Sequence, residues 1–597
     1  MVSSNYQAEW ARLSVCIRQY QKKSRGYLLA KLGFFSLGGC FIYWTVDGFS
    51  YQTVVGAVWA FILYLVACVA DNKCQKKMSV WREMQSVCKK ELAYRKGDFS
   101  AFDSGECYSN PAHEYSFDLD IFGPSSLYNR INRCVTQLGR NRLAEKLTVL
   151  AQQEQQIHRY QDAIGELADQ FHWRIKFMAN RFVPDNSAVF STFVAREIRH
   201  SSFLQSMVPY ALVSMTAFTF LLGLTEVIAW SWFAGSVFIN WGCSMCFLKK
   251  MAIMGSNLEQ LHKGMVDYEE ILSDLQGSSF SSSLLVSLQK DLFQGETSSL
   301  KAFRDLARIL NLIDQRSNAL IYLLFNGLFL YDIMLLRRIL YWKEQHLDQM
   351  EQWLSDIAEF DAVVSLANYA YNHPSRTVAE VLPADSDVVV EATEVYHPFL
   401  SDGQAVTNNF TLRKGNVAVV TGANMAGKST FLRTIGLNYI LACNGVPVCA
   451  TSFKFMIVAL FSSMRTTDNL SKDISYFHAE LMRLKQLLLF VQTHPYTLII
   501  LDEILKGTNS KDKLEGSRMF LYEIIRYRVA ALIATHDLEL AKLEEEKGEV
   551  FQNYCFEIEL SAQIKYTYRI TKGVARNLNA SFLLRNILSK IREGEVR

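Results

Sequence analysis

The stretch TGANMAGKST, residues 421–430, decides the fold of the last third of this 597-residue chain. It contains the pattern G-x-x-x-x-G-K-S from Gly422 to Ser429. The β-branched segment NVAVV (416–420) leads into it, and the helix-favouring segment FLRTIGLNYILA (431–442) follows it. A strand, a glycine-rich loop and a helix in this order are typical of a phosphate-binding loop, whereas a chance glycine-rich turn needs no such context. The sequence therefore predicts a nucleotide site here.

The residue types within the loop indicate how it would contact the phosphates and Mg²⁺. Backbone N–H groups and the positive end of the following helix are expected to face the phosphates. Lys428 is expected to reach the β- and γ-phosphates, and the Ser429 hydroxyl to bind Mg²⁺. The predicted nucleotide contacts in this loop are Gly422, Ala423, Asn424, Met425, Ala426, Gly427, Lys428, Ser429 and Thr430.

Two apolar segments further along end in polar residues suited to the same site. YTLIILDE (496–503) ends in Asp502, placed for Mg²⁺ directly or through water, and in Glu503, which would polarise the attacking water. The apolar segment ALIATHD (531–537) carries His536 near its end. A lone histidine is more often structural, but in this order His536 is a candidate sensor of the γ-phosphate. The catalytic candidates are thus Glu503 and His536, and the metal ligands Ser429 and Asp502.

The chain is also unusually apolar in blocks. Hydrophobic residues make up 50% of it, and the net charge of +3 gives no whole-chain basic excess that would indicate nucleic acid. Four segments approach the ~20 apolar residues that a membrane-spanning helix needs. They are 27–46, 53–70, 207–224 and 227–248.

Lysine and arginine residues lie at the outer ends of each pair of segments. They precede the first of each pair and follow the second, while the short connections inside each pair contain none. This pattern predicts two hairpins with both ends in the cytoplasm, although buried helices of a large helical protein are the alternative. Lys31 in the first span is expected to extend its head to the interface. The apolar stretch 319–336 carries Asn326 and Asp332, and we expect it to be a buried core helix.

Between and beyond the hairpins, helical periodicity dominates. It marks 126–150, 152–171, 304–316 and 353–372. Proline and polar residues over 372–387 then give way to strand-like β-branched runs, which indicates a domain boundary.

Together these residues resemble the MutS family of DNA mismatch-repair ATPases, which belong to the ABC-type branch of P-loop proteins. The family's loop reads close to TGxNMxGKST, and Asn424 and Met425 are in place. Asp473 stands where the family's signature has glycine. In the helical part, SLYNRINRCVTQLGRNRLAEKL (126–147) and IHRYQDAIGELA (157–168) resemble the start of the family's helical core. The further matching segments are LDEILKGTNSKDKLEGS (501–517), ALIATHDLELAKLEE (531–545), MRTTDNLSKDISYFHAELMRLKQLL (464–488), YHPFL (396–400) and YRITKGVARNLNASFLLRNI (568–587), so that the resemblance covers about 120–180 and 300–597.

The resemblance implies an ATP hydrolase that uses ATP and Mg²⁺ and closes two sites across a homodimer. Ser475 of one subunit would cap the ATP that Lys428 holds in the other. The first 200 residues hold no F-x-E, the motif that the family uses to read mismatches. The family's aromatic residue that stacks on adenine has no obvious counterpart around Ala405.

The predicted fold is an α-helical lever or core domain with transmembrane helical hairpins, plus an α/β P-loop ATPase domain of the ABC type. The expected divisions are 1–100 with the first hairpin, 101–206 as the first part of the lever, 207–248 as the second hairpin, 249–375 as the second part of the lever, and 376–597 as the ATPase domain.

The expected function is a membrane-anchored, multi-pass MutS-like ATPase that moves a helical lever, with its helical and ATPase domains in the cytoplasm. By resemblance, mismatched, damaged or branched DNA is a candidate partner. The alternative is a DNA-independent membrane mechanoenzyme that acts on an unknown protein or lipid partner, and a transporter ranks last.

Overall fold

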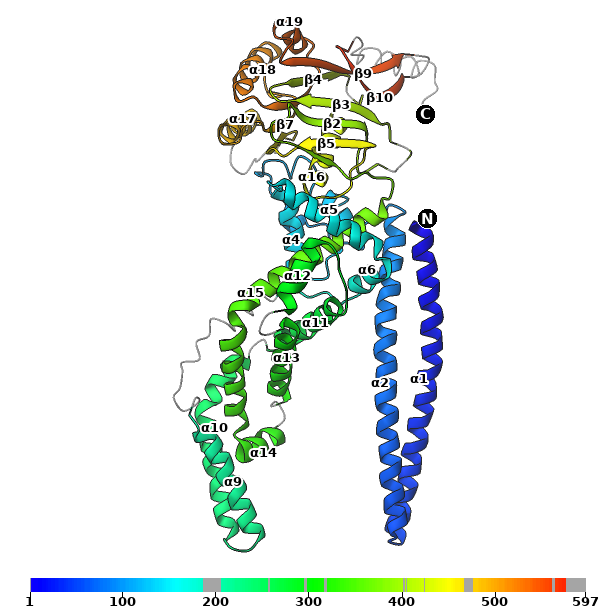
Figure 1. Ribbon diagram of the computed structural model, residues 1–597, viewed down its shortest axis with the longest axis vertical. Coiled ribbons are helices and arrows are strands. Elements are labelled where there is room, and N and C mark those ends of the chain that lie inside the picture. Colours follow the sequence, from blue (N-terminus) through cyan, green and yellow to red (C-terminus); the bar gives the residue numbers. More distant parts are fainter. Residues whose placement is uncertain are drawn as a thin grey trace, which may run out of the picture.

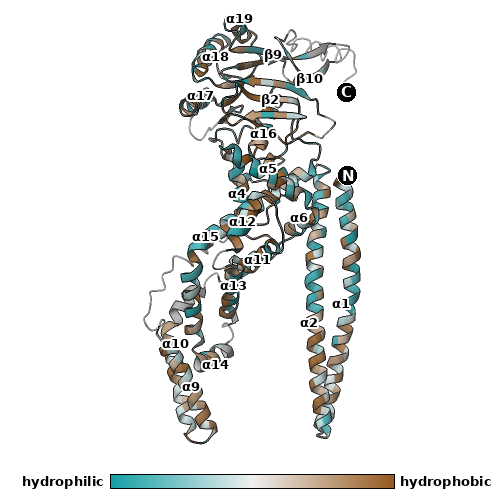
Figure 2. Cartoon of the chain, in the orientation of Figure 1, coloured by the Kyte–Doolittle hydropathy of each residue, from teal (hydrophilic) through white to brown (hydrophobic). Residues whose placement is uncertain are grey.

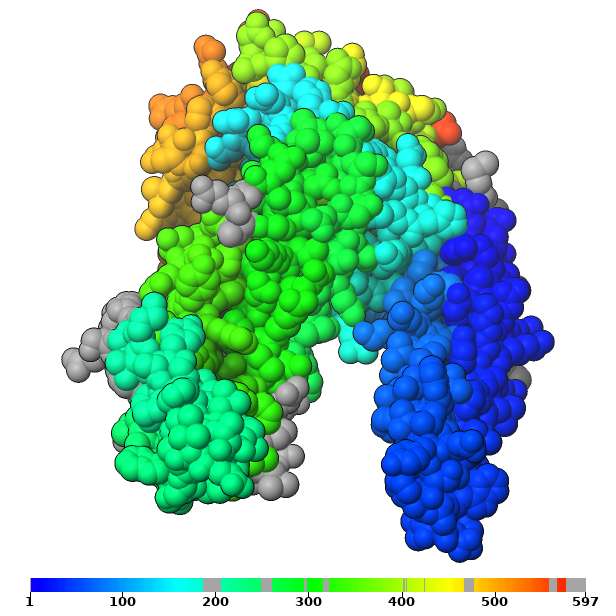
Figure 3. Space-filling view, turned by 60° about the horizontal axis from the view of Figure 1, so that its bottom comes forward, coloured from blue at the N-terminus to red at the C-terminus, as the bar shows by residue number. Residues whose placement is uncertain are grey.

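A computed structural model describes residues 2–185, 206–255, 258–294, 298–315, 319–400, 403, 405–423, 425–465, 476–560 and 564–575. A sheet-containing domain lies at one end, a helical body lies next to it, and two helical legs leave the body on the side away from the sheets (Figure 1). Seen from the side of the legs, they are two separate projections (Figure 3). The chain is mostly helical up to Asn372 and mixed α/β from Glu380 onward.

The first leg is a hairpin of two long helices, α1 (Val2–Asp47) and α2 (Tyr51–Tyr94). The predicted spans 27–46 and 53–70 lie in their outer halves, where brown, apolar residues gather (Figure 2). Among the described helices, only these two are long and apolar enough to cross a membrane, and their most apolar windows are 0% and 11% buried. Length and composition alone are weak evidence of a span, since core helices and signal sequences can pass the same test.

Lys31 does not extend to solvent as expected, since it forms an ion pair with Asp71 of α2. The Lys31 Nζ lies 2.5 Å from the Asp71 Oδ2, and Ser24 donates a hydrogen bond to the other carboxylate oxygen at 2.7 Å. Asp71 lies on the neighbouring helix, forty residues further along the chain, so the residues around Lys31 do not predict this ion pair. The pair compensates two charges at the inner end of the apolar segments.

The second leg contains α9 (Val208–Leu224), α10 (Trp230–Gly255) and α14 (Ala319–Phe329). α9 is apolar but has only 17 residues, so length and composition do not support four spans. The expectation of one buried helix over 319–336 is wrong. Leu330 adopts a left-handed conformation (φ 48°) that ends α14, and the described side chains of α14 are largely exposed. Asn326, which argued for a core helix, instead faces α10, so that the apolar residues face outward.

The helical body is organised around α15 (Tyr331–Asn372), whose second half is almost entirely buried. The predicted helical stretch 126–150 divides into α3 and α4 because the backbone N–H groups of Val135 and Thr136 turn to donate to Asp361 of α15, at 3.1 and 2.8 Å. The other body elements are η1 (Glu106–Tyr108), α3 (Leu127–Ile131), α4 (Gln137–Thr148), α5 (Glu154–Asp169), α6 (Phe171–Met178), α11 (Leu258–Gln276), α12 (Ser283–Phe293) and α13 (Ser299–Gln315).

The C-terminal domain holds two sheets. A four-stranded sheet has the order β1-β5-β2-β3, and a six-stranded sheet the order β10-β9-β4-β8-β7-β6, in which all neighbours except β10 and β9 are parallel. Their strands are β1 (Glu380–Leu382), β2 (Val388–Val395), β3 (Asn408–Arg413), β4 (Val417–Gly422), β5 (Ser452–Met456), β6 (Leu460–Ser463), β7 (Leu498–Asp502), β8 (Ala530–Thr535), β9 (Phe551–Leu560) and β10 (Ile564–Lys572).

Helices cover the six-stranded sheet and complete the domain. Residues of α16 pack on buried strand residues, with Ile500 of β7 reaching Gly436 of the helix. The helical elements are α16 (Lys428–Cys443), α17 (Tyr476–Thr493), α18 (Ser510–Ile524), η3 (Ile525–Tyr527), η4 (Leu540–Lys542) and α19 (Leu543–Glu546).

Candidate functional site

Three neighbouring parallel strands end level with one another and bring the predicted site residues to one edge of the sheet. Thr421 of β4 pairs with Thr535 of β8, and Asp502 of β7 pairs with Ala534 of β8. The glycine-rich loop, the acidic pair and His536 follow these three strand ends directly. In open parallel sheets ligands bind outside the carboxyl ends of the strands, which is where these residues lie.

The loop after β4 has a shape that only glycine permits at two positions. Gly422 has φ 152°, and a Cβ atom there would lie 2.9 Å from the carbonyl oxygen of Phe556. Gly427 has φ 107°, and a Cβ atom there would lie 3.1 Å from the ring of Tyr568. The loop is therefore pressed against β9 and β10 and enters α16 directly at Lys428. Asn424 lies outside the described residues.

Lys428 turns its side chain back into the loop. Its Nζ donates hydrogen bonds to the carbonyl oxygens of Gly422 and Ala423, at 2.6 and 3.0 Å. Burial lowers the pKa of Lys428, and the charge of Asp502 acts in the opposite direction. The ammonium group is thus held inside the turn, while Ser429 and Thr430 are exposed in the first turn of α16.

Glu503 is held in a fixed position beside His536. Its backbone is left-handed (φ 61°), and its N–H donates to the carbonyl oxygen of Ala534 at 2.9 Å. The carboxylate contacts the His536 Nδ1 and lies 3.5 Å from the Lys513 Nζ. A carboxylate oriented by a histidine can accept a proton from a water molecule, as general-base chemistry requires.

The oxygen donors near the loop fit Mg²⁺. Ser429 offers a hydroxyl and Asp502 a carboxylate, which are ligands that this hard cation prefers. Over the described ranges, no group of three His, Cys, Asp or Glu side chains could hold a metal by itself. Two protein ligands leave the remaining positions for water and substrate phosphates, which is how Mg²⁺ is usually bound.

A pocket of about 320 Å³ adjoins the loop and the start of α16. Aromatic side chains from two parts of the domain line it, namely Tyr396 and His397 after β2 and Tyr568 in β10. Burial, together with the charges of Arg433 and Arg130, lowers the pKa of His397 to about 4, so its ring is neutral at neutral pH. Sequence reasoning missed this pocket, because only the pairing of β10 with β9 brings Tyr568 over the loop.

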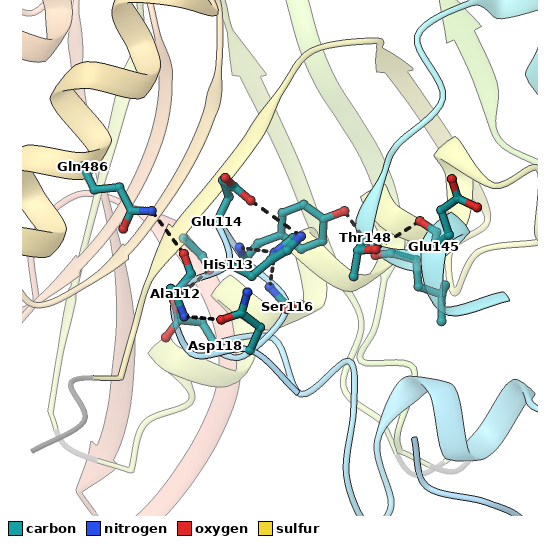
Figure 4. Close-up of polar contacts among 12 residues, drawn as sticks. Ala112, His113, Glu114, Ser116, Asp118, Glu145, Thr148 and Gln486 are labelled. Carbon is teal, nitrogen blue, oxygen red and sulfur yellow. Dashed lines mark hydrogen bonds and ion pairs between the residues drawn. The ribbon is translucent and has the colours of Figure 1, made fainter. Parts of the chain in front are cut away.

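A segment of the body also docks on the domain close to this site. Gln486 of α17 donates a hydrogen bond to the carbonyl oxygen of Ala112 (Figure 4). The carbonyl oxygens of residues 113 and 114 accept from Arg483 of α17, and that of residue 114 also accepts from the backbone N–H of Ser462. Asp118 accepts from the backbone N–H of Arg465 at 2.8 Å. No sequence pattern predicts this contact, since these residues lie more than 300 positions apart.

The predicted trans contact, Ser475, lies outside the described residues, together with the rest of 466–475. It stays a prediction.

Comparison with known proteins identifies the domain that carries this site. Residues 418–582 match the family model of MutS domain V. The DNA mismatch repair proteins MutS of Acetivibrio thermocellus and Rhodopirellula baltica are 32% and 33% identical to this chain over 243 and 241 residues. That of Chlamydia trachomatis serovar D is 30% identical over 249 residues. This part of the chain is similar to domain V of the MutS proteins.

The likeness is confined to part of each protein. The matched segments make up 39–40% of this chain but only 26–30% of the three relatives, so the chain spans less than a third of their length.

Proposed function

We propose that the MutS-type domain binds ATP with Mg²⁺ and hydrolyses it, and that the chain carries this ATPase on a membrane. The meeting of the glycine-rich loop, the acidic pair and His536 at one sheet edge is the observation that carries the proposal. The match to MutS domain V supports it independently.

In this proposal each residue of the site has a distinct task. Lys428 and the loop amides bind the phosphates, and Ser429 and Asp502 hold Mg²⁺, which neutralises the charge that develops on the phosphates. Glu503, oriented by His536, positions the attacking water and accepts its proton. The neighbouring pocket receives the nucleobase against Tyr568 and the neutral ring of His397.

We further propose that two copies of the chain close around two ATP molecules, with Ser475 of each copy facing the nucleotide of the other. The long helix α15 links this motor to the second leg, because it runs from the domain at Asn372 to the left-handed break at Leu330. The first leg is linked by residues 112–120, which follow α2 and contact the domain. Closure would therefore move both legs.

Membrane attachment is supported by the two legs. The apolar ends of α1 and α2 and the α9–α10 hairpin project on the same side, away from the ATPase domain (Figure 2). A single bilayer could receive both, and the lysine and arginine flanks would then place the ATPase domain in the cytoplasm.

DNA is a second candidate partner, favoured by the relatives, which are named DNA mismatch repair proteins. The test is ATP turnover by the detergent-purified chain with homoduplex, mismatched or branched DNA, at two salt concentrations. Phosphate contacts make DNA affinity fall steeply with salt, so DNA-driven turnover would be salt-sensitive. Turnover indifferent to DNA would indicate a membrane or protein substrate, and absence of turnover in every condition would refute the ATPase.

A further inference from the structure

The helix α14 presents an apolar face that no described part of the chain covers. Leu323, Leu324, Phe325 and Phe329 are each 42–57% exposed, within a helix of eleven residues. Contiguous apolar surface of this kind marks a contact with a membrane or a protein. It continues the exposed apolar surface of the α9–α10 hairpin, against which α14 packs (Figure 1).

The opposite face of α14 is joined to the hairpin by buried hydrogen bonds. The Asn240 Nδ2 donates to the Thr216 Oγ1 of α9 at 2.9 Å and to the carbonyl oxygen of Gly327 at 2.8 Å. The Ser244 Oγ donates to the Asn326 Oδ1 at 3.0 Å. The three helices therefore form one unit with polar groups inside and apolar groups outside, the reverse of a water-soluble bundle.

The close fit at Gly327 shows that this unit is tightly packed. A Cβ atom at that position would lie 2.8 Å from the Val237 Cγ1 of α10. Small residues allow helices to approach closely, and polar side chains then bond across them, as in helix packing within membranes.

At the break between α14 and α15, protein groups provide hydrogen-bond partners for the backbone. Leu330 donates its N–H to the Asn326 carbonyl oxygen at 3.1 Å, and Asp332 donates its N–H to the Asn326 Oδ1 at 2.9 Å. Hydrocarbon offers no water to irregular backbone, so such a break survives there only where protein groups provide the partners. Asn326 and Asn240 supply them.

Arginine side chains appear about two turns along α15. Arg337 lies seven residues beyond Leu330, about 10 Å along the helix axis. It donates to the carbonyl oxygen of Ser206 at 2.6 Å and lies over the ring of Tyr210. With Arg338 and Tyr341, these side chains border a groove of about 440 Å³. Tyrosine and arginine of this kind are typical of the headgroup level of a bilayer.

We propose that α14 lies inside the bilayer as a third membrane element of the second leg, with its outer face on lipid acyl chains and Tyr210 and Arg337 at the headgroups. This rests on the proposed membrane attachment of the hairpin. This arrangement also explains why α9 can be as short as 17 residues. The leg enters the bilayer as a packed three-helix unit rather than as two independent spans. Leu330, where α14 ends, then lies about 10 Å along the α15 axis from Arg337, on the side of the acyl chains.

The test places a genetically encoded fluorescent amino acid at position 324 of the full chain, which avoids the twelve native cysteines. Position 221 on α9 and position 286 on α12 serve as matched exposed apolar sites. Each protein is reconstituted into vesicles of phosphatidylcholine and phosphatidylglycerol, with nitroxide quenchers on the acyl chains or iodide in the water. We expect positions 324 and 221 to lose most of their fluorescence to the nitroxide and position 286 to iodide.

Quenching at 221 but not at 324 would overturn this inference and leave the membrane attachment standing. A blue-shifted probe at 324 that neither quencher reaches would also overturn it, since a protein would then cover α14. Iodide quenching at all three positions would refute the attachment of the second leg itself. Position 325 repeats the measurement should the first variant fail to fold.

Discussion

Asp120 accepts hydrogen bonds from both terminal nitrogens of Arg465, at 2.7 and 2.9 Å, and a third from Arg433 at 2.8 Å. Arg433 belongs to α16, the helix that starts at the glycine-rich loop, and Arg465 immediately precedes the segment 466–475. Asp120 follows the first leg in sequence. One carboxylate thus joins the candidate nucleotide site to the part of the chain that continues from α2.

Replacement of this carboxylate tests the connection. Asp120→Asn should lower ATP turnover about 10-fold, because small misplacements of a catalytic constellation are costly. It should reduce stability by only about 1 kcal/mol, since the pair is partly exposed. Asp103→Asn is the control: it breaks a similarly exposed pair with Arg140 in the body. Equal turnover in both variants would show that Asp120 has no effect on the site.

The acidic pair after β7 gives a sharper prediction. Glu503→Gln should bind ATP but lose about 10²- to 10⁴-fold in turnover, because the amide cannot accept the proton of the attacking water. Lys428→Ala should lose nucleotide binding. Glu539→Gln, an exposed change in the segment after β8, is the control. Binding by a fluorescent ATP analogue and phosphate release measure the two effects, and normal turnover in Glu503→Gln would contradict the assignment.

His397 should make stability depend on pH. Its pKa is lowered to about 4 in the folded chain, below the ~6.5 of an exposed histidine. The unfolded chain therefore binds more protons between these values, and the stability from His397 is complete above about 6.5 and is lost as pH falls through 4. Between pH 7 and 5 the loss amounts to about 2 kcal/mol.

His397→Asn keeps an acceptor for the N–H of Phe399 and removes the titration. Unfolding midpoints at pH 7 and 5 should therefore differ less in this variant than in the unaltered chain. His494→Asn, at an exposed position, should leave the difference unchanged. A pH dependence that persists in His397→Asn would assign it to another group.

Contiguous signals made part of this structure predictable. The strand before the loop, the loop and the helix after it are neighbours in sequence, so their pattern alone located β4 and α16. Contacts between segments far apart in the sequence could not be predicted in this way. Tyr568 reaches the pocket only through the pairing of β10 with β9, and Lys31 pairs with Asp71 on another helix. Asn326 misled the prediction because one polar residue fits a protein core and a polar seam between apolar helices equally well.

The turn between α3 and α4 supports the last prediction. Asp361 of α15 accepts hydrogen bonds from the backbone of Val135 and from the backbone and hydroxyl of Thr136, and the Thr136 hydroxyl in turn accepts from the N–H of Gly139. A Cβ atom at Gly139 would lie within 3 Å of three side-chain atoms of Asp361. Because the carboxylate is fully buried and cannot move without losing its donors, Gly139→Ala should destabilise the chain by about 2–3 kcal/mol.

Gly165→Ala is the matched control, because it adds the same methyl group to α5 where nothing lies within 4 Å. Alanine has the higher helix propensity, so this variant should be stabilised by up to about 1 kcal/mol. The two substitutions are therefore expected to shift the thermal unfolding midpoint in opposite directions. A shift of the same sign and size in both would mean that α4 does not meet Asp361 as described, and that α15 is not held to the first part of the body at this point.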